Sequence, residues 1–522
     1  MRFDKEINQI YKKMQSMLTV RNGRLRELKP DYHEFVAVLS EIEAAIDQMH
    51  APMRVAIAGY MKAGKSTLMN AILKRKVVLT GSMITTYTPT WFRYNEKESL
   101  EIVFEDGHRI SGLPLSELEN WTSIQSRDSN SKIDEVSYVI LNYPEDILKE
   151  IELIDTPGLF SPEEKDSERT IRLLGLDDIA QANQVGQSHV SFADAIVYVF
   201  SSNFKTSDMS AVKAFTSTPI NAIAVFTKLE QSFWNPLTPV ISPFDNMKSV
   251  VTRNEEALKS DIYCILPVVS IMVEGFSQIT DEDWEQLQMI AKAPNEQLVK
   301  SLLSPKTFEK TELEGTSQKS RLRLYQLLDR YGIYCVVQGI QNGVLRDEML
   351  DYLYSVSGVE ELVSMLKEHF GLRAFIIKTE AVFARLERQI QKIKYAVDCS
   401  AIAKKMCVQL EQELEEGRNL REFRELTLLR RFYEGEIHFP RKEDNDAFIR
   451  LMGEEGNGAA KKLGVCSGAS IEELQRTVIS IHTYWSRLAN DETLERAEKN
   501  AAQSVLESVG DMRYHIEMLS GF

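Results

Sequence analysis

Apolar residues recur at helical spacing at both ends of the chain and in short runs through its middle. Near the start they lie three or four positions apart within residues 7–17 and again within residues 35–49. The same spacing governs residues 383–397, 471–488 and 502–519. Each segment has one narrow apolar stripe, and a stripe of this kind needs a partner to be buried. The pattern therefore predicts amphipathic helices that pack together as one elongated antiparallel bundle.

Between those ends, apolar runs alternate with helical stretches, which is the pattern of a mainly parallel sheet with helices on both faces. A polar stretch, residues 304–319, is predicted to be a mobile insertion, and the proline-rich residues 235–243 a surface loop. After residue 371 the strands stop, and a proline-free stretch over residues 373–433 predicts one helix of up to roughly 90 Å. The predicted strands are residues 55–58, 90–94, 100–104, 139–141, 151–154, 195–200, 222–226, 265–269 and 333–337.

This alternation divides the chain into three parts. Residues 1–50 supply the N-terminal helices, residues 51–371 the α/β domain, and residues 372–522 the C-terminal helices, with a candidate tip at residues 438–463. Because the two helical parts come from opposite ends of the chain and need each other, the α/β domain is predicted to be inserted into the bundle. The predicted fold class is α/β plus all-α.

Composition narrows the choice of partners. The chain has 522 residues and a net charge of −15, so its surface as a whole repels nucleic acid, and we expect no nucleic-acid partner. Its five cysteines lack the spacing of zinc ligands, which favours reduced thiols and a cytoplasmic location. We do not expect the charged, periodic N-terminus to be a signal peptide, and no apolar run approaches the length of a membrane span.

The first predicted strand leads directly into a phosphate-binding motif. Gly59, Gly64, Lys65 and Ser66 fit G-x-x-x-x-G-K-[ST], and a helical pattern begins at Thr67. The loop amides and the helix N-terminus would wrap a polyphosphate, Lys65 would supply a point charge, and Ser66 would place a hydroxyl on Mg²⁺. The candidate phosphate-binding residues are Gly59, Met61, Lys62, Ala63, Gly64, Lys65, Ser66 and Thr67.

Two further segments supply candidates for metal and γ-phosphate contacts. The strand at residues 151–154 ends in Asp155, which would hold Mg²⁺ through water, and the N–H of Gly158 would contact the γ-phosphate. In the polar loop of residues 79–89, Thr86 is the candidate that completes the Mg²⁺ shell and orders the loop. Thr85 is the alternative, and an ordinary strand-entry loop is the bland interpretation.

A base-reading turn follows the strand at residues 222–226. Thr227 and Lys228 begin a T-K-x-E turn in which the stem of Lys228 would lie over the base and Glu230 would accept hydrogen bonds from guanine. GTPases place an aspartate at this last position, so the longer Glu230 makes base selectivity a matter of geometry. Ser270, at the end of a later strand, is a candidate for a backbone contact to guanine O6.

These motifs together resemble the bacterial dynamin-like GTPases, and among their branches the one that includes the labile enterotoxin output protein. The residues after position 357 are also similar to the last helix of that domain as it enters the bundle. The resemblance implies a P-loop GTPase domain that hydrolyses GTP to GDP with Mg²⁺, at a low basal rate that dimerisation stimulates. The motifs that carry it are Gly59-x-x-x-x-Gly64-Lys65-Ser66, Thr86, Asp155-Thr156-Pro157-Gly158 and Thr227-Lys228-Leu229-Glu230.

The same resemblance implies partners and a location. We expect a homodimer through the nucleotide face, movement of the helical stalk, and contact with membrane lipid or a partner dynamin-like protein. The location would be the cytoplasm, or the inner membrane face as a peripheral protein. For lipid contact the candidate is the tip at residues 438–463, where Phe439 and Phe448 have basic neighbours; a solvated turn is the alternative because acidic residues lie there too.

One departure from the family suggests a catalytic role. Eukaryotic dynamins have a glutamine and a serine where this chain has Met61 and Lys62. The ammonium of Lys62 would sit where other dynamins hold a monovalent cation, next to the developing charge of the phosphates, and a solvated lysine is the bland interpretation. The missing glutamine also fits a second reading, a nucleotide-binding scaffold or sensor with little turnover. A GTPase for ribosome or tRNA assembly is a third, which the net acidity disfavours.

Overall fold

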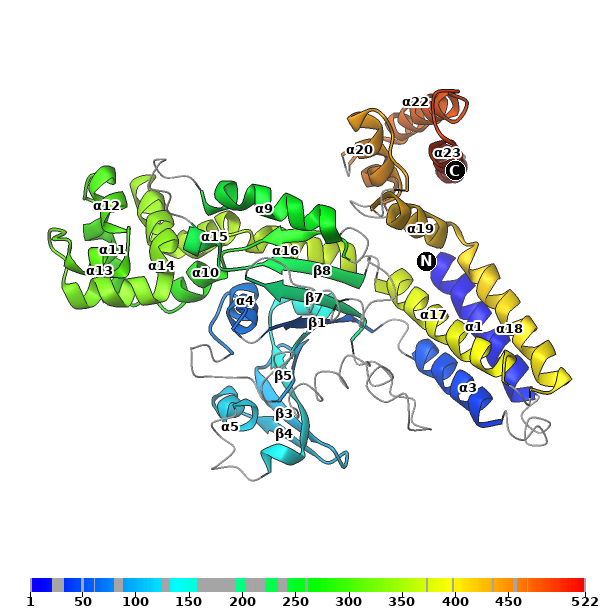
Figure 1. The fold of residues 1–522 in the computed structure, drawn as a ribbon, viewed down its shortest axis with the longest axis horizontal. Coiled ribbons are helices and arrows are strands. Elements are labelled where there is room, and N and C mark those ends of the chain that lie inside the picture. Colours follow the sequence, from blue (N-terminus) through cyan, green and yellow to red (C-terminus); the bar gives the residue numbers. More distant parts are fainter. Residues whose placement is uncertain are drawn as a thin grey trace.

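The computed structural model describes most of the chain and places a single large sheet next to two groups of long helices (Figure 1). Predicted motifs whose residues are absent from the ranges given next lie outside what the structure describes. The described residues are 2–20, 32–47, 51–60, 62–78, 88–123, 132–156, 193–201, 212, 221–232, 242–258, 262–371, 374–396, 399–433, 436–453, 458–466 and 468–520.

Nine strands form the sheet in the order β4-β3-β5-β2-β6-β1-β7-β8-β9. β6, β1, β7, β8 and β9 run parallel, whereas β2 is antiparallel to β6, and β3 is antiparallel to β4 and β5. Every residue of β7 and β8 is buried, as expected for parallel strands covered on both faces. The strands are β1 (Met53–Gly59), β2 (Thr90–Tyr94), β3 (Ser99–Phe104), β4 (Arg109–Leu113), β5 (Val136–Tyr143), β6 (Ile151–Asp155), β7 (Ala195–Phe200), β8 (Ala222–Phe226) and β9 (Ile265–Pro267).

Helices surround the sheet and extend the α/β domain away from the long helices. α10 packs against both α4 and α14, and the small helices α11 and α13 pack on α14 at the far end of the domain (Figure 1). These elements are α4 (Lys65–Ile72), α5 (Leu118–Thr122), α9 (Pro243–Leu258), α10 (Ser270–Phe276), α11 (Asp281–Ile290), α12 (Asn295–Ser301), α13 (Pro305–Lys310), α14 (Gln318–Gln341), α15 (Arg346–Val356) and α16 (Val359–Met365). Shorter turns are η1 (Leu115–Glu117), η3 (Ile133–Glu135), η4 (Asp146–Lys149), η6 (Leu229–Ser232) and the π-helical η7 (Leu366–Gly371).

Two predictions inside this domain are wrong. Residues 333–337, predicted as a strand, belong to the buried helix α14, because a short apolar run is compatible with either element. A Cβ built on Gly332 would lie 2.7 Å from Cβ of Met272, so a glycine is what lets α14 approach α10 closely. Residues 304–319, predicted as a mobile insertion, contain α13, whose N-cap Ser304 accepts a hydrogen bond from the Thr307 amide, and the start of α14.

Edge strand β4 was not predicted. Its residues are mostly exposed, and Gly112 has a φ of 81°, so neither alternation nor composition marks a strand there. Among the described strands it pairs with β3, and its Ile110 and Leu113 pack against the core. The other predicted strands are confirmed, although the last run forms a strand only over Ile265–Pro267.

Four helices from opposite ends of the chain form what we call the neck bundle: α1 (Arg2–Val20), α3 (Tyr32–Asp47), α17 (Ala374–Lys394) and α18 (Ala401–Arg418). α1 packs against α3 and α18, and α17 packs against the same two helices. The ring of Tyr11 meets that of Phe383 edge-on at 5.8 Å, in a core that is continuous with the sheet. The predicted class, an α/β domain joined to helices from both chain ends, is confirmed.

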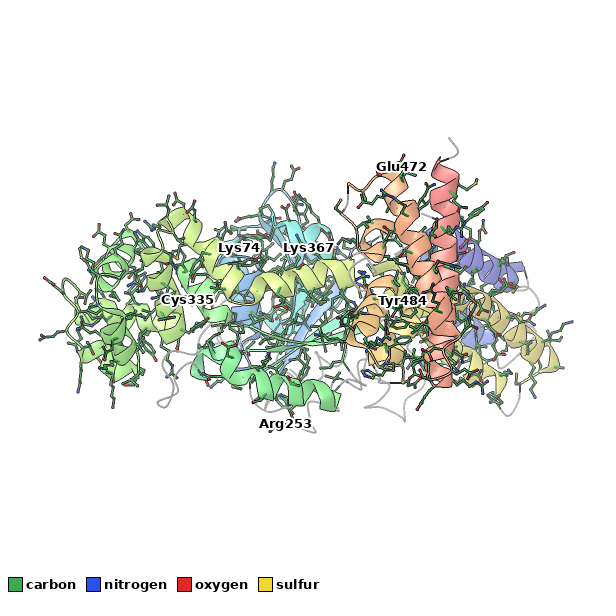
Figure 2. The ribbon with its side chains drawn as sticks, turned by 90° about the horizontal axis from the view of Figure 1, so that it is seen from above. Lys74, Arg253, Cys335, Lys367, Glu472 and Tyr484 are labelled. Atoms are coloured by element: carbon green, nitrogen blue, oxygen red, sulfur yellow. The ribbon has the colours of Figure 1, made fainter. Side chains whose placement is uncertain are left out.

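The remaining helices form a second hydrophobic core, which we call the outer cluster. It combines α19 (Arg421–Tyr433), α20 (Lys442–Leu451), α21 (Ala459–Leu463), α22 (Ile471–Ala489) and α23 (Arg496–Ser520). Figure 2 shows α22 and α23 side by side, with Glu472 near one end of this hairpin. α19 joins the two groups, because Phe423 belongs to the neck core and Leu429 to the outer core. The prediction of one bundle is therefore wrong: the seams of α22 and α23 cover each other.

The predicted long helix is also interrupted. α17 ends at Lys394 and α18 begins after Ser400, whose hydroxyl caps it by accepting from the Ala403 amide at 3.1 Å. A second break separates α18 from α19. A serine that caps a helix competes with continuation of the preceding helix, and this signal outweighs the absence of proline in the stretch.

The aromatic residues of the predicted tip are not exposed to solvent. Phe439 and Phe448 are fully buried, and both pack against Trp485 in the outer cluster. Insertion of these two rings into lipid, as predicted for the tip, is therefore wrong for this conformation. No helix within the described ranges combines the length and the apolar character needed to cross a bilayer.

Candidate functional site

The carboxyl ends of the central parallel strands gather the predicted site residues along one edge of the sheet. Ile57 of β1 is in register with Asp155 of β6, and Gly59 with Val199 of β7. β2 enters from this same edge, because Thr90 is paired antiparallel with Asp155. An open α/β sheet offers its ligand crevice at the carboxyl ends of its strands, so this edge is the place for a phosphate site.

The glycines of the loop after β1 have backbone conformations that require glycine. Gly64 has a φ of 100° and caps the N-terminus of α4. Gly59 has a φ of 150°, and a Cβ built there would lie 2.2 Å from the Val199 carbonyl oxygen. The loop is closed by a hydrogen bond from the Ala63 amide to the Tyr60 carbonyl at 3.1 Å. Backbone amides can therefore approach a phosphate without interference from side chains.

Lys65 folds back over this loop. Its Nζ donates to the carbonyls of Gly59 and Tyr60 at 3.1 and 3.2 Å. Burial lowers the pKa of Lys65, and the nearby carboxylate of Asp155 opposes that shift. The ammonium thus lies beside the loop and interacts electrostatically with the carboxylate of Asp155, as expected for a group that neutralises bound phosphate.

The donor set at this edge fits Mg²⁺. Asp155 is fully buried at the end of β6, and Ser66 is half-buried in the first turn of α4. One carboxylate and one hydroxyl are too few to enclose a metal, but Mg²⁺ in nucleotide sites takes its other ligands from phosphate oxygens and water. The neighbouring Thr156 hydroxyl donates to the Ile57 carbonyl at 2.8 Å and fixes the end of β6 against β1.

The predicted base-reading turn is attached directly to the phosphate loop. The Thr227 hydroxyl hydrogen-bonds the Ala63 carbonyl at 2.6 Å, and Nζ of Lys228 donates to the Lys62 carbonyl at 2.6 Å. Lys62 and Lys228 both have left-handed φ values, 64° and 61°. These two bonds join loops that are far apart in the sequence, so the position of one loop determines that of the other.

Glu230 lies in the turn η6 and is almost completely buried. Burial raises its pKa to about 7, and the negative charge of Asp329 adds to the effect. Asp329 interrupts α14 with a φ of 53°, and the guanidinium of Arg330 donates to the Gln231 carbonyl at 3.0 Å. Asp329 and Arg330 were not predicted as part of the site, and nothing in the sequence around them signals this contact.

The structure describes most, though not all, of the predicted residues. Ser270 is buried and begins α10, and the Val269 amide before it donates to the Ser357 carbonyl at 2.8 Å. Ala63 is buried, Thr67 is half-buried, and Lys62 is exposed. Met61, Thr85, Thr86 and Gly158 lie outside the described residues.

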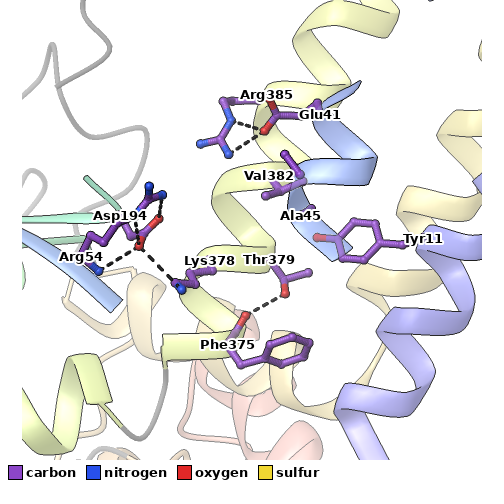
Figure 3. A pocket seen from close by; sticks show the side chains of 11 residues that line it. Tyr11, Glu41, Ala45, Arg54, Asp194, Phe375, Lys378, Thr379, Val382 and Arg385 are labelled. Atoms are coloured by element: carbon purple, nitrogen blue, oxygen red, sulfur yellow. Dashed lines mark hydrogen bonds and ion pairs between the residues drawn. The ribbon is translucent and has the colours of Figure 1, made fainter. Parts of the chain in front are cut away.

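A second polar cluster lies where the α/β domain meets the neck bundle (Figure 3). Arg54 of β1 forms an ion pair with Asp194 at 3.0 Å, beside a cavity of about 40 Å³. From α17, Nζ of Lys378 donates to the carbonyls of Ala51 and Pro52 at 2.8 and 3.1 Å and lies 3.8 Å from Asp194. Burial raises the pKa of Asp194, but Arg54 and Lys378 outweigh it and hold that pKa below its usual value.

Comparison with known proteins agrees with this geometry. Residues 55–228, which span the phosphate loop and the start of the base-reading turn, match the dynamin family. The chain is 23% identical over 493 residues to isoniazid-induced protein IniC of Mycobacterium tuberculosis, covering 91% of this chain and 93% of that protein. It is 31% identical over 142 residues to dynamin-like protein 2 of Campylobacter jejuni, covering 26% of this chain and 22% of that protein.

A solved structure described as an oligomerised bacterial dynamin pair aligns with 98% of this chain and 74% of its own, at 13% identity and a TM-score of 0.33. At that score the alignment adds nothing to the argument. The family match over residues 55–228, together with the phosphate loop, identifies this part of the chain as a dynamin-family domain, and the chain as a whole is similar to bacterial dynamin-like proteins.

Proposed function

We propose that this chain hydrolyses GTP to GDP and phosphate with Mg²⁺. The observation that carries the proposal is the attachment of the base-reading turn to the phosphate loop, through Thr227 to Ala63 and Lys228 to Lys62. Such an arrangement suits a nucleoside triphosphate, whose base and phosphates must be held at a fixed separation.

Each residue has a defined part in this proposal. Lys65 gives up its bonds to the Gly59 and Tyr60 carbonyls and neutralises charge on the phosphates. Ser66 and Thr86 ligate Mg²⁺, and Asp155 orients it; the bound ion would neutralise charge on the phosphate oxygens. The Gly158 N–H contacts the γ-phosphate, and Glu230 and Ser270 face guanine.

Lys62 is proposed to act in the reaction itself. Its exposed side chain belongs to the phosphate loop, and its carbonyl is held by Lys228. An ammonium there supplies the positive charge that a monovalent cation supplies in other dynamins, so turnover would not depend on potassium.

The test measures phosphate release with purified protein over a range of concentrations, together with calorimetric titration of GTP, GDP and ATP. We expect guanine nucleotides to bind in preference to ATP and the specific activity to climb with protein concentration, because the nucleotide face would form a homodimer. Binding of GTP without turnover at any concentration would support the scaffold or sensor instead. No binding of any nucleotide would refute both.

The helices give this cycle a mechanical output in the proposal. Nucleotide-dependent pairing of two GTPase domains would move the neck bundle and the outer cluster, through the junction at Arg54, Asp194 and Lys378. The partner would be a second copy, a related dynamin-like protein or a lipid surface at the inner membrane face. Flotation of the full chain with anionic liposomes, with and without a non-hydrolysable GTP analogue, tests the lipid contact. Absence of the protein from the floating liposome fraction under both conditions would exclude that contact.

A further inference from the structure

A buried asparagine lies in α4, just beyond the phosphate loop, and every donor and acceptor position of its side-chain amide makes a hydrogen bond. Asn70 is fully buried. Its Oδ1 accepts from the backbone amides of Val77 and Val78 at 2.9 and 2.7 Å. Its Nδ2 donates to the Val78 carbonyl at 2.7 Å and to Oε1 of Glu274 at 2.9 Å. Two acceptor and two donor positions are all that an amide side chain has, so Asn70 is saturated.

The four bonds connect three parts of the proposed nucleotide site. Asn70 belongs to α4, the helix that begins with Lys65 and Ser66. Val77 and Val78 lead into residues 79–87, which lie outside the described residues and contain the predicted Thr86. Glu274 is buried in α10, the helix whose first residue is Ser270.

We propose that Asn70 and Glu274 are positioning residues that fix the phosphate end and the base end of the nucleotide site relative to each other. This inference rests on the proposed function. Neither side chain touches the nucleotide; Asn70 fixes the point from which the chain departs toward Thr86, and Glu274 ties that point to α10. We call the four residues Asn70, Val77, Val78 and Glu274 the asparagine bridge.

Few substitutions preserve this connection. Aspartate at position 70 keeps the acceptor for the Val77 and Val78 amides but loses both donors, and it sets a carboxylate against Glu274 and the Val78 carbonyl. Leaving a buried polar group without its partner lowers the stability of the fold by more than an average hydrogen bond contributes to it. Glu274→Gln supplies an amide that donates, so in combination with Asn70→Asp it restores one bond with donor and acceptor exchanged.

The chain offers a matched control in the outer cluster. Asn445 is also buried, and its Nδ2 donates to the carbonyls of Phe439 and Arg441 at 2.7 and 3.1 Å. Its Oδ1 accepts from the Phe439 amide at 2.9 Å. Asn445→Asp therefore removes two donated bonds, as Asn70→Asp does, and keeps its one accepted bond where Asn70→Asp keeps two, but it lies far from the nucleotide edge.

The experiment measures calorimetric affinities of the full chain for GDP and for a non-hydrolysable GTP analogue with Mg²⁺. We expect wild-type protein to prefer the triphosphate, and Asn70→Asp to reduce that preference roughly tenfold with little change in GDP affinity. Adding Glu274→Gln should recover part of the preference, and Asn445→Asp should leave it unchanged while lowering the unfolding temperature. If Asn70→Asp does not fold, Glu274→Met removes the bond from Asn70 Nδ2, leaves the other three bonds of Asn70 in place, and should reduce the preference roughly threefold.

The outcomes separate this inference from the function on which it rests. If the wild-type chain binds neither nucleotide, the proposed function fails. If it binds both, then equal affinities in the wild type, or an unchanged preference in the folded variants, overturn the asparagine bridge and leave the nucleotide site standing.

Discussion

Single residues set the chemistry of the site, and Lys62 is the clearest case. With a φ of 64° it adopts a left-handed conformation that costs a residue with a side chain about 1–2 kcal/mol. The bond from Lys228 to its carbonyl holds it there. A strained residue beside a phosphate loop indicates a constraint of function, since strain of this kind persists only where the surroundings enforce it.

The first prediction concerns the cation requirement. We expect wild-type protein to hydrolyse GTP equally well in sodium and potassium, and Lys62→Ser to slow turnover roughly tenfold because it removes the ammonium. Potassium should then stimulate the variant. Lys76→Ser, a change to another exposed lysine, serves as the control. A strong potassium requirement in wild-type protein would contradict the role given to Lys62.

The second prediction concerns Glu230 and pH. Its folded pKa of about 7 lies above the ordinary value of 4.5, so the buried carboxyl is protonated in the free protein over a range where the unfolded chain is ionised. Its contribution to stability is therefore lost as pH rises toward 7, by up to roughly 3 kcal/mol. Glu230→Gln should abolish this slope in urea unfolding, whereas Glu360→Gln, at an exposed carboxyl, should keep it.

Guanine binding should respond to pH in the opposite direction. Only the ionised carboxylate accepts two hydrogen bonds from guanine, so GTP affinity should increase as pH rises through about 7. In Glu230→Gln we expect affinity to fall roughly tenfold and to lose its pH dependence. Calorimetry between pH 6 and pH 8 checks this, and a flat wild-type profile would exclude Glu230 from base recognition.

Sequence alone predicted the parts of the candidate site that are contiguous. The phosphate loop and the turn at Thr227 are local motifs whose residues are adjacent in the chain. Asp329 and Arg330 escaped prediction because they reach Glu230 only through a break in α14. Asn70 escaped because its partners lie in Val78 and in Glu274, and a lone asparagine in a helix carries no signal of either contact.

At the scale of elements, the junction between β1 and α17 depends on Lys378. Its side chain is 11% exposed, and it supplies two hydrogen bonds to carbonyls that precede β1. On the same helix, Lys392 is 73% exposed and only 3.5 Å from Glu34. The two lysines differ in burial, which decides how much each ion pair or hydrogen bond contributes.

The third prediction compares these lysines. Lys378→Met should lower the free energy of unfolding by about 2 kcal/mol, because it leaves the Ala51 and Pro52 carbonyls without this donor. Lys392→Met should change it by less than about 0.5 kcal/mol. Urea denaturation followed by circular dichroism measures both, and equal effects would show that the junction is not specially stabilised by Lys378.

Elements that sequence patterns misplaced share a physical cause. The run at residues 333–337 has the composition of a strand, yet Gly332 lets it pack as a helix against α10, and Gly339 lets the same helix approach α15. The proline-free stretch continues through Ser400, but the capping bond of that serine starts a new helix. In both cases a tertiary contact or a cap overrode a local preference, and neither can be weighed from spacing alone.

Within the described ranges, the molecule has two hydrophobic cores, and α19 contributes residues to both. One core runs from the neck bundle through the sheet, and the other is confined to the outer cluster. The buried ion pair of Lys462 with Glu425, at 2.6 Å, holds α21 to α19 within the outer part. Separate cores favour separate cooperative units, so unfolding is expected to occur in two steps. The branch of the family to which the chain belongs stays a prediction.

The fourth prediction assigns these steps. Phe448→Ala should lower the free energy of unfolding of the outer cluster by about 3–5 kcal/mol. Phe383→Ala should do the same for the unit that contains the neck bundle and the sheet. Nucleotide binding should raise only the step that contains the sheet. Differential scanning calorimetry with and without GDP resolves the two, and a single transition in every variant would mean that the cores melt together.

In the free protein, the ammonium of Lys65 already has hydrogen-bond acceptors in the phosphate loop. With Gly59 and Tyr60 as acceptors, Lys65 is not stranded when phosphate leaves, and the departing GDP exchanges one set of partners for another. Under the proposed function, product would therefore leave more easily than from a pocket that holds an unsatisfied ammonium. We expect such a chain to exchange nucleotide without a separate exchange factor.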